Sequence, residues 1–239
     1  MTPDATIEHL GVLSRIDALI AVLSDMKDAY VIDVGCGDGA VARALAARGA
    51  RVSGYDAFIG DDHQDWAAEG PGAWRLRRGR ADSIPEPDGC ADVVVYMYSL
   101  HHVPKAELEK ALRTASRLLK PSGRLCVIEP VPEGAMQYVS ELYHDETAVR
   151  RDAKHALEQV AAPLFEDETE LAFTERTVLH DFDSFSARAL LGARFNAYRA
   201  EDVTSSDVKS RFAEMLAKFG GDFDQPARIN MFSGRRSAH

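Results

Sequence analysis

Residues 30–39, Tyr-Val-Ile-Asp-Val-Gly-Cys-Gly-Asp-Gly, constrain the fold of this chain more than any other stretch. An apolar run ends in Asp33, three glycines alternate with other residues, and the helix-forming segment 40–48 follows at once. Glycines accept positive φ and let a ligand lie against the main chain, and the first N–H groups of a helix have no partner within it. The stretch therefore predicts a strand, a tight turn and a helix, with N–H groups of the turn pointing toward a ligand.

Charge separates the two classes of ligand that use such a turn. Gly35, Gly37 and Ala40 satisfy the G-x-G-x-x-G/A pattern of dinucleotide binders. However, Asp33 precedes the first glycine and Asp38 lies inside the turn. Two carboxylates repel a pyrophosphate but suit a ligand that carries an ammonium and a sulfonium. The sequence favours a cationic nucleoside, and an NAD-dependent oxidoreductase is the less favoured alternative.

Three stretches resemble the class I S-adenosylmethionine-dependent methyltransferases. Residues 33–39 resemble motif I of that family, residues 91–104 resemble strand four of its small-molecule members related to quinone biosynthesis, and residues 119–125 match its L-K-P-G-G-x-L signature with Ser for one Gly. The resemblance implies S-adenosylmethionine as cofactor and S-adenosylhomocysteine as product. In motif I it implies that the cofactor contacts are Asp33, Gly35, Cys36, Gly37 and Gly39, with Cys36 as a small spacer.

The resemblance also implies an α/β fold, a doubly wound seven-stranded mixed sheet with helices on both faces. The whole chain would form one methyltransferase domain. Residues 1–29 would be an N-terminal helical lid, 30–130 the cofactor-binding core, 131–169 a helical insertion that shapes the substrate pocket, and 170–239 the C-terminal strands and helices. Residues 58–72 read as a connection with one short helix.

The composition of the chain limits the kinds of partner that we expect. The chain has 239 residues, enough for one α/β domain with a full core, and a formal net charge of -10 that disfavours nucleic acid. No run is long enough to cross a bilayer, and no secretion signal is present. The three cysteines have no paired spacing, which fits a reduced cytoplasmic protein.

Two acids follow predicted strands. Asp56 ends the strand 51–56, where an acid can accept both ribose hydroxyls, and the resemblance places Asp56 and Ala57 at the cofactor ribose. Asp82 matches the family's acceptor for the adenine amino group, with Ser83 lining the base. A turn or helix-capping acid for Asp56, and a surface-loop acid for Asp82, remain the alternatives.

Residues 91–104 contain a continuous apolar run, typical of a central parallel strand, and ligands bind beyond the carboxyl end of such strands. A structural role is one interpretation of the two histidines. The other makes His101 the candidate general base and His102 a candidate substrate contact. Met97 stands where the family has a small polar residue, so the cofactor contacts there fall to backbone atoms. Adjacent histidines rarely chelate one ion, and we predict no metal.

Further substrate contacts come from later segments. Glu129 ends the fifth strand, and Tyr138, Tyr143 and His144 lie in the predicted insertion. Helix capping and ordinary packing explain these residues equally well. Near the N-terminus, Arg15 either faces a ligand or belongs to a solvated helix face, and the second interpretation is favoured. The resemblance implies methyl transfer to a small-molecule acceptor by in-line displacement, and the alternative is a protein that binds S-adenosylmethionine without transferring its methyl group.

Overall fold

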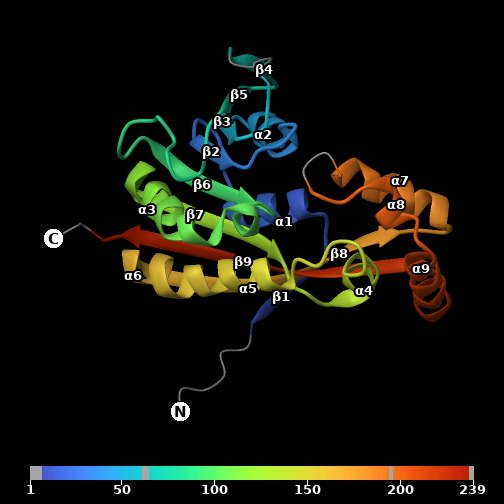
Figure 1. The fold of residues 1–239 in the computed structure, drawn as a ribbon. Coiled ribbons are helices and arrows are strands. Elements are labelled where there is room, and N and C mark those ends of the chain that lie inside the picture. Colours follow the sequence, from blue (N-terminus) through green and yellow to red (C-terminus); the bar gives the residue numbers. More distant parts are fainter. Residues whose placement is uncertain (1–6, 61–64, 194–195, 237–239) are drawn as a thin grey trace.

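The computed structural model describes residues 7–60, 65–193 and 196–236. Within these residues, one mixed sheet runs through the molecule in the order β1-β8-β9-β7-β6-β2-β3-β5-β4 (Figure 1). The strands are β1 (Glu8–Val12), β2 (Tyr30–Val34), β3 (Arg51–Asp56), β4 (Ala67–Glu69), β5 (Gly72–Arg78), β6 (Ala91–Met97), β7 (Leu119–Pro130), β8 (Phe165–Val178) and β9 (Asp222–Arg235).

The seven inner strands confirm the predicted doubly wound sheet. Strands β5, β3, β2, β6 and β7 run parallel to one another, and β9 enters antiparallel between β7 and β8. The antiparallel β9 makes the sheet mixed, as the family resemblance implies. Two short edge strands, β1 and β4, extend this core beyond the prediction.

Helices cover both faces of the sheet. They are α1 (Arg15–Leu23), α2 (Ala40–Ala46), α3 (Leu108–Leu118), α4 (Gly134–Ser140), α5 (Thr147–Ala156), α6 (Ala162–Leu164), α7 (Phe182–Gly192), α8 (Ala200–Val203) and α9 (Ser206–Phe219), with shorter turns η1 (Leu100–His102), η2 (Lys105–Glu107) and η3 (Leu157–Ala161). No helix among the described residues is long and apolar enough to cross a membrane.

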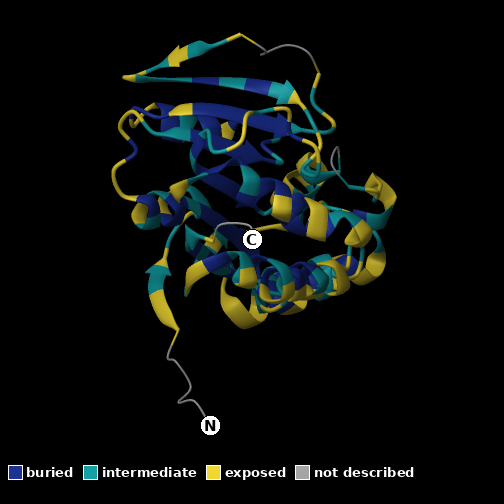
Figure 2. Cartoon of the chain, turned by 90° about the vertical axis from the view of Figure 1, so that its left-hand side faces the viewer, coloured by how far each residue is buried: buried dark blue, intermediate teal, exposed yellow. Residues whose placement is uncertain are grey.

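Successive side chains of the central strands point to opposite faces of the sheet, so they fill the core on both sides of it. Val31 of β2 packs with α1 and α2 on one face, whereas Ile32 packs with α3, α5 and η3 on the other. In β6, Val93 and Val95 join the first cluster and Val94 joins the second. Figure 2 shows these strands as the buried centre beneath helices with exposed outer faces. Burial on both faces explains why the sequence of β6 is continuously apolar.

A third apolar cluster lies at one end of the sheet. It joins α4, α7, α8 and α9 to the start of β9, and these helices gather beyond the sheet in Figure 1. Phe212 stacks on Phe223 with ring centroids 5.0 Å apart, so α9 is fixed to β9. Of these helices, α4 and α7 contribute residues to the site described below.

The prediction of an N-terminal helical segment is wrong for residues 8–12. Those residues form β1, which pairs in parallel with the open edge of β8. Gly11 has a φ of +91°, which no helix accommodates, and the helix begins only after Ser14, whose hydroxyl accepts from the Asp17 N–H. The part of the predicted lid at residues 1–6 lies outside the described residues.

Two further boundaries differ from the sequence prediction. Within residues 58–72, β4 forms a hairpin with β5, which the sequence did not predict. Residues 61–64, on which the expected short helix also falls, lie outside the described residues. The helical insertion ends at Leu164, because residues 165–169 already pair with β9. The insertion is also interrupted between α4 and α5, and that interruption carries several residues of the site.

Candidate functional site

The glycine turn between β2 and α2 lies directly against the segment that follows β6. Gly35 has a φ of +73°, and a Cβ atom there would lie 2.4 Å from the Cβ of Ser99. Ser99 is held in place, because its hydroxyl donates to the Val34 carbonyl at 2.6 Å. Only glycine fits at position 35, both for its backbone conformation and for the space available.

The N–H groups of this turn already have acceptors inside the protein, contrary to the prediction that they point toward a ligand. Those of Gly35 and Cys36 donate to the Tyr55 carbonyl at 2.7 and 3.2 Å. That of Gly37 donates to Oδ2 of Asp56 at 3.1 Å. A pyrophosphate needs free donors at such a turn. The turn is therefore a poor phosphate site, which agrees with the preference for a cationic ligand.

Asp33 ends β2 as a buried and unpaired acid. It is 1% exposed, and neither carboxylate oxygen has a hydrogen-bond partner among the described residues. Burial, and then the negative charge of Asp56, raise the pKa of Asp33 to about 7. A buried carboxylate without a partner is unfavourable unless a positive charge offsets it. Since the next two residues, Val34 and Gly35, line the cleft described below, a cation in that cleft would supply this charge.

Asp56 joins the turn to the end of β3. Its Oδ2 accepts from Gly37 N–H, and its Oδ1 accepts from Phe58 N–H at 2.8 Å. A carboxylate offers about four lone-pair sites, so two remain for a ligand. Asp56 also lines the cleft, which puts this acceptor capacity beside the glycine turn.

These residues surround a cleft of about 460 Å³ beyond the carboxyl ends of β2, β3 and β6. In the sheet, β3 lies on one side of β2 and β6 lies on the other. The connections leaving β2 and β6 therefore diverge, and ligands of open α/β sheets bind at such a point. The strand order alone thus places a ligand site at the turn.

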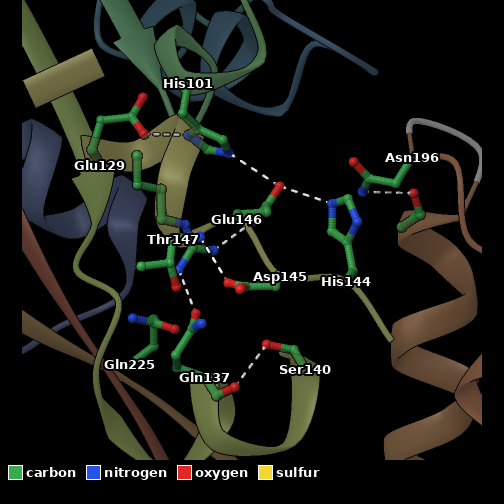
Figure 3. A network of polar contacts seen from close by, with 12 residues as sticks. His101, Glu129, Gln137, Ser140, His144, Asp145, Glu146, Thr147, Asn196 and Gln225 are labelled. Carbon is green, nitrogen blue, oxygen red and sulfur yellow. Dashed lines mark hydrogen bonds and ion pairs between the residues drawn. The ribbon is translucent and has the colours of Figure 1, made fainter. Parts of the chain in front are cut away.

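A network of polar side chains extends from the sheet toward the α4–α5 connection (Figure 3). Oε1 of the fully buried Glu129 accepts from Leu100 N–H at 2.9 Å, and Oε2 contacts Nδ1 of His101. Nε2 of His101 lies 3.4 Å from Oε1 of Glu146, and that oxygen lies 3.0 Å from Nε2 of His144. Arg150 donates to the other Glu146 oxygen at 2.5 Å. The chain ties β7, η1 and the α4–α5 connection together.

Each ring nitrogen of His101 lies beside a carboxylate oxygen, Nδ1 beside Glu129 and Nε2 beside Glu146. Burial alone lowers its pKa, but Glu129 and then Glu146 raise it to about 9. Atoms of His101, His102 and Glu146 lie within 4.8 Å of one another, a spacing that a metal ion could also use. Both nitrogens of His101 face carboxylates, so we interpret the centre as an imidazolium between two anions.

Stability is expected to fall at alkaline pH because of His101. Its folded pKa, about 9, lies above the ordinary value of 6.5, so its stabilising contribution is complete below pH 6.5 and disappears as pH rises through 9. The loss is at most about 3 kcal/mol. Denaturant titrations of the wild type at pH 7 and pH 10 should show this fall, and His101→Gln should be less stable at pH 7 with a smaller change between the two.

The exposed His155 offers the matched control for that measurement. His155→Gln should keep the pH dependence of the wild type. An equal pH dependence in His101→Gln and the wild type would contradict the charged assignment.

A second, smaller pocket of about 260 Å³ adjoins the cleft. Arg15 and Asn196 line both cavities, so the two are adjacent. The guanidinium of Arg15 lies 4.5 Å from the ring centroid of Tyr98, which also lines the cleft, and its Nε contacts Glu175 at 3.0 Å. Arg15 therefore lines the site, which was the less favoured of its two predicted positions.

Residues 32–127 match the family model described as a methyltransferase domain. This segment of the chain is therefore similar to a methyltransferase domain. The match covers β2 through most of β7, which includes the glycine turn, Asp56 and the two histidines.

Related proteins agree with the methyltransferase assignment. An uncharacterized methyltransferase YcgJ of Bacillus subtilis is 31% identical over 41% of this chain and 40% of its own length. A ubiquinone/menaquinone biosynthesis C-methyltransferase UbiE of Caulobacter is 34% identical over 49% of this chain and 51% of its own. The chain thus spans about half or less of these curated relatives. The crystal structure of YcgJ shares the fold, with a TM-score of 0.61 at 18% identity over 93% of this chain and 99% of the other.

The structure brings most predicted cofactor residues of the methyltransferase domain to the cleft, and it leaves a few elsewhere. The predicted residues that line the cleft are Gly35, Cys36, Gly37, Asp56, Ala57 and Met97. Asp33 lies buried behind them, and Gly39 packs on Leu76 at the start of α2.

Asp82 and Ser83 do not line the cleft. The Asp82 carboxylate contacts Nζ of Lys110 on α3 at 3.0 Å and Nε of Arg80 at 3.2 Å, and the Ser83 hydroxyl donates to it. These cations hold Asp82 toward α3. The neighbouring Ala81 lines the cleft in its place.

Some of the predicted catalytic and substrate residues line one of the two cavities, and others do not. His102 lines the cleft, and Tyr143 and His144 line the second pocket. His101 and Glu129 lie beneath both cavities without lining either, and Tyr138 is 52% exposed outside them. Glu146, Arg188 and Tyr198 were missed, because no local pattern connects residues from three separate segments.

Proposed function

We propose that this protein is an S-adenosylmethionine-dependent methyltransferase that acts on a small molecule. The observation that carries the proposal is the unpaired carboxylate of Asp33, buried beneath a turn whose N–H groups are already bonded. Such a site disfavours a phosphate and favours a positive charge. The sulfonium and ammonium of S-adenosylmethionine supply that charge.

The residues of the cleft fit this cofactor by their chemistry. Gly35 and Gly37 let its amino-acid part approach the main chain. Asp56 has acceptor capacity for the ribose hydroxyls, and Ala57 and Met97 offer apolar surface to the base. When bound, S-adenosylmethionine supplies a methyl group already activated by the sulfonium. The protein's own task is then to hold the acceptor in line with that group and to exclude water.

Substitution of Asp56 tests the proposal. Asp56→Asn keeps the side-chain size but removes the charge that accepts hydroxyl hydrogen bonds. We expect calorimetric titration to show about 10- to 100-fold weaker binding of S-adenosylmethionine. Asp88→Asn, at an exposed acid outside the cleft, is the control and should bind like the wild type. An unchanged affinity of Asp56→Asn for S-adenosylmethionine would contradict the proposal that Asp56 binds the ribose hydroxyls.

We further propose that the protein works in the cytoplasm with a small-molecule partner and without nucleic acid. The net charge of -10 repels phosphate backbones, and Cys36, Cys90 and Cys126 are free thiols, as in a reducing compartment. Retention on immobilised DNA at physiological salt would contradict the first point. A disulfide in protein isolated from its native cells would contradict the second.

A further inference from the structure

The second pocket lies where a methyl acceptor has to lie. Arg15 and Asn196 line both this pocket and the cofactor cleft, so a molecule in one adjoins a molecule in the other. Its other walls come from the α4–α5 connection and α7, outside the segment that matches the methyltransferase family model. The family match therefore says nothing about what this pocket holds.

The charge of the pocket is opposite to that of the protein. Three guanidinium groups line it, from Arg15, Arg150 and Arg188, against the single carboxylate of Glu146. Arg15 pairs with Glu175, and Arg150 pairs with Glu146. On a chain with a net charge of -10, this excess of positive charge marks a place for an anion.

Arg188 is the cation that remains for a ligand. It makes no hydrogen bond or ion pair with any residue that the structure describes. A guanidinium presents two parallel donors that match a carboxylate. An acceptor with a carboxylate would therefore satisfy Arg188 without breaking any pair between described residues.

Aromatic side chains form another wall of this pocket. The ring of Tyr143 meets Tyr198 edge to face with centroids 5.0 Å apart, and meets Phe185 at 6.2 Å. Such walls favour a flat, apolar ring. A cavity of about 150 Å³ can hold benzene, so about 260 Å³ has room for one ring with substituents.

His144 adds a base at the same pocket. It is 29% exposed, and its Nε2 lies 3.0 Å from Oε1 of Glu146. If Nε2 donates to that carboxylate, Nδ1 is left as an acceptor, the arrangement of a general base oriented by a carboxylate. A base of this kind is useful when the acceptor is a hydroxyl group that must lose its proton.

We propose that the second pocket binds the methyl acceptor, and that this acceptor is a small aromatic carboxylate bearing a hydroxyl group. Its carboxylate lies on Arg188, its ring lies against the wall formed by Tyr143, Phe185 and Tyr198, and its hydroxyl faces His144. This inference rests on the proposed function. As the hydroxyl oxygen bonds to the methyl carbon, the carbon–sulfur bond breaks with its electron pair staying on sulfur, and the hydroxyl proton moves to Nδ1 of His144.

Calorimetry with three hydroxybenzoates and the matching uncharged hydroxybenzamides tests the carboxylate site. The protein is first saturated with S-adenosylhomocysteine, so a failure of the proposed function appears as absent binding in that step. We expect at least one hydroxybenzoate to bind about tenfold or more tightly than its amide. Arg188→Gln should abolish that preference and leave the affinity for S-adenosylhomocysteine unchanged. Arg113→Gln, on α3 outside both cavities, should keep it.

Two binding results would overturn the inference. One is equal binding of acid and amide by the wild type, or binding of neither, in protein that does bind S-adenosylhomocysteine. The other is a preference for the acid that survives in Arg188→Gln.

Methyl transfer to the bound hydroxybenzoate tests the role of His144. His144→Gln should lose about 100-fold in turnover at pH 7 and regain most of it above the pKa of the phenol, where the acceptor is already ionised. A loss that stays constant with pH would contradict the role of His144 as base. Absence of transfer to any bound hydroxybenzoate would contradict the acceptor class.

Discussion

Replacing Gly35 by alanine is expected to abolish cofactor binding and to destabilise the protein by about 3 kcal/mol or more. The new methyl group would lie 2.4 Å from Cβ of Ser99. Ser99 cannot move away easily, because its hydroxyl is bonded to the Val34 carbonyl on β2. The turn would have to shift, and with it the hydrogen bond from Gly37 to Asp56. Chemical denaturation and titration with S-adenosylmethionine measure the two effects.

Gly220 separates the backbone effect from the collision. It follows α9 with a φ of +64°, and a Cβ there would meet nothing within 4 Å. Gly220→Ala should therefore show only the strain of the left-handed conformation, about 1 kcal/mol, and normal cofactor affinity. Similar stability losses in the two variants would show that the contact with Ser99 does not constrain the turn.

Asp33→Asn is expected to stabilise the protein without cofactor and to weaken cofactor binding by about tenfold or more. Burial and the charge of Asp56 raise the pKa of Asp33 to about 7, above its ordinary value of 3.8. The folded protein therefore loses stability as pH rises from about 4 to 7, by at most about 4 kcal/mol, and stays at the lower value above pH 7. Asparagine removes this charge, so the gain in stability should be largest at pH 8 and small at pH 4.

Proton release gives an independent check on Asp33. A cation in the cleft lowers the pKa of this acid, so binding of S-adenosylmethionine near pH 7 should release a fraction of a proton. Calorimetry in buffers of different ionisation enthalpy measures that release. It should vanish in Asp33→Asn and persist in Asp88→Asn. A release that persists unchanged in Asp33→Asn would show that another group responds to the cofactor.

The sequence predicts the sheet and the turn because both depend on local patterns. The buried runs of β2 and β6 require cover on both faces, and the strand–glycine–helix pattern places Asp33 and Gly35 together. Asp56 follows from the same logic, since it ends the neighbouring parallel strand. In each case the position at the carboxyl end of a strand determines where the side chain lies.

Other parts of the site depend on partners that are distant in the sequence. Asp82 turns away from the cleft because Lys110, 28 residues later, attracts it. Glu146 reaches His101 only because the predicted long helix is interrupted before α5. Residues 8–12 form a strand because β8 offers an open edge. None of these contacts leaves a periodic or short-range signal in the chain.

Calorimetric titration of the wild type with S-adenosylmethionine, S-adenosylhomocysteine and NADH tests the central claim most directly. The charges around the glycine turn predict binding of the first two and negligible heat from NADH, whose pyrophosphate would meet Asp33 and Asp56 and find the amides of the turn already bonded. Binding of NADH with an affinity equal to or greater than that of S-adenosylmethionine would contradict the account.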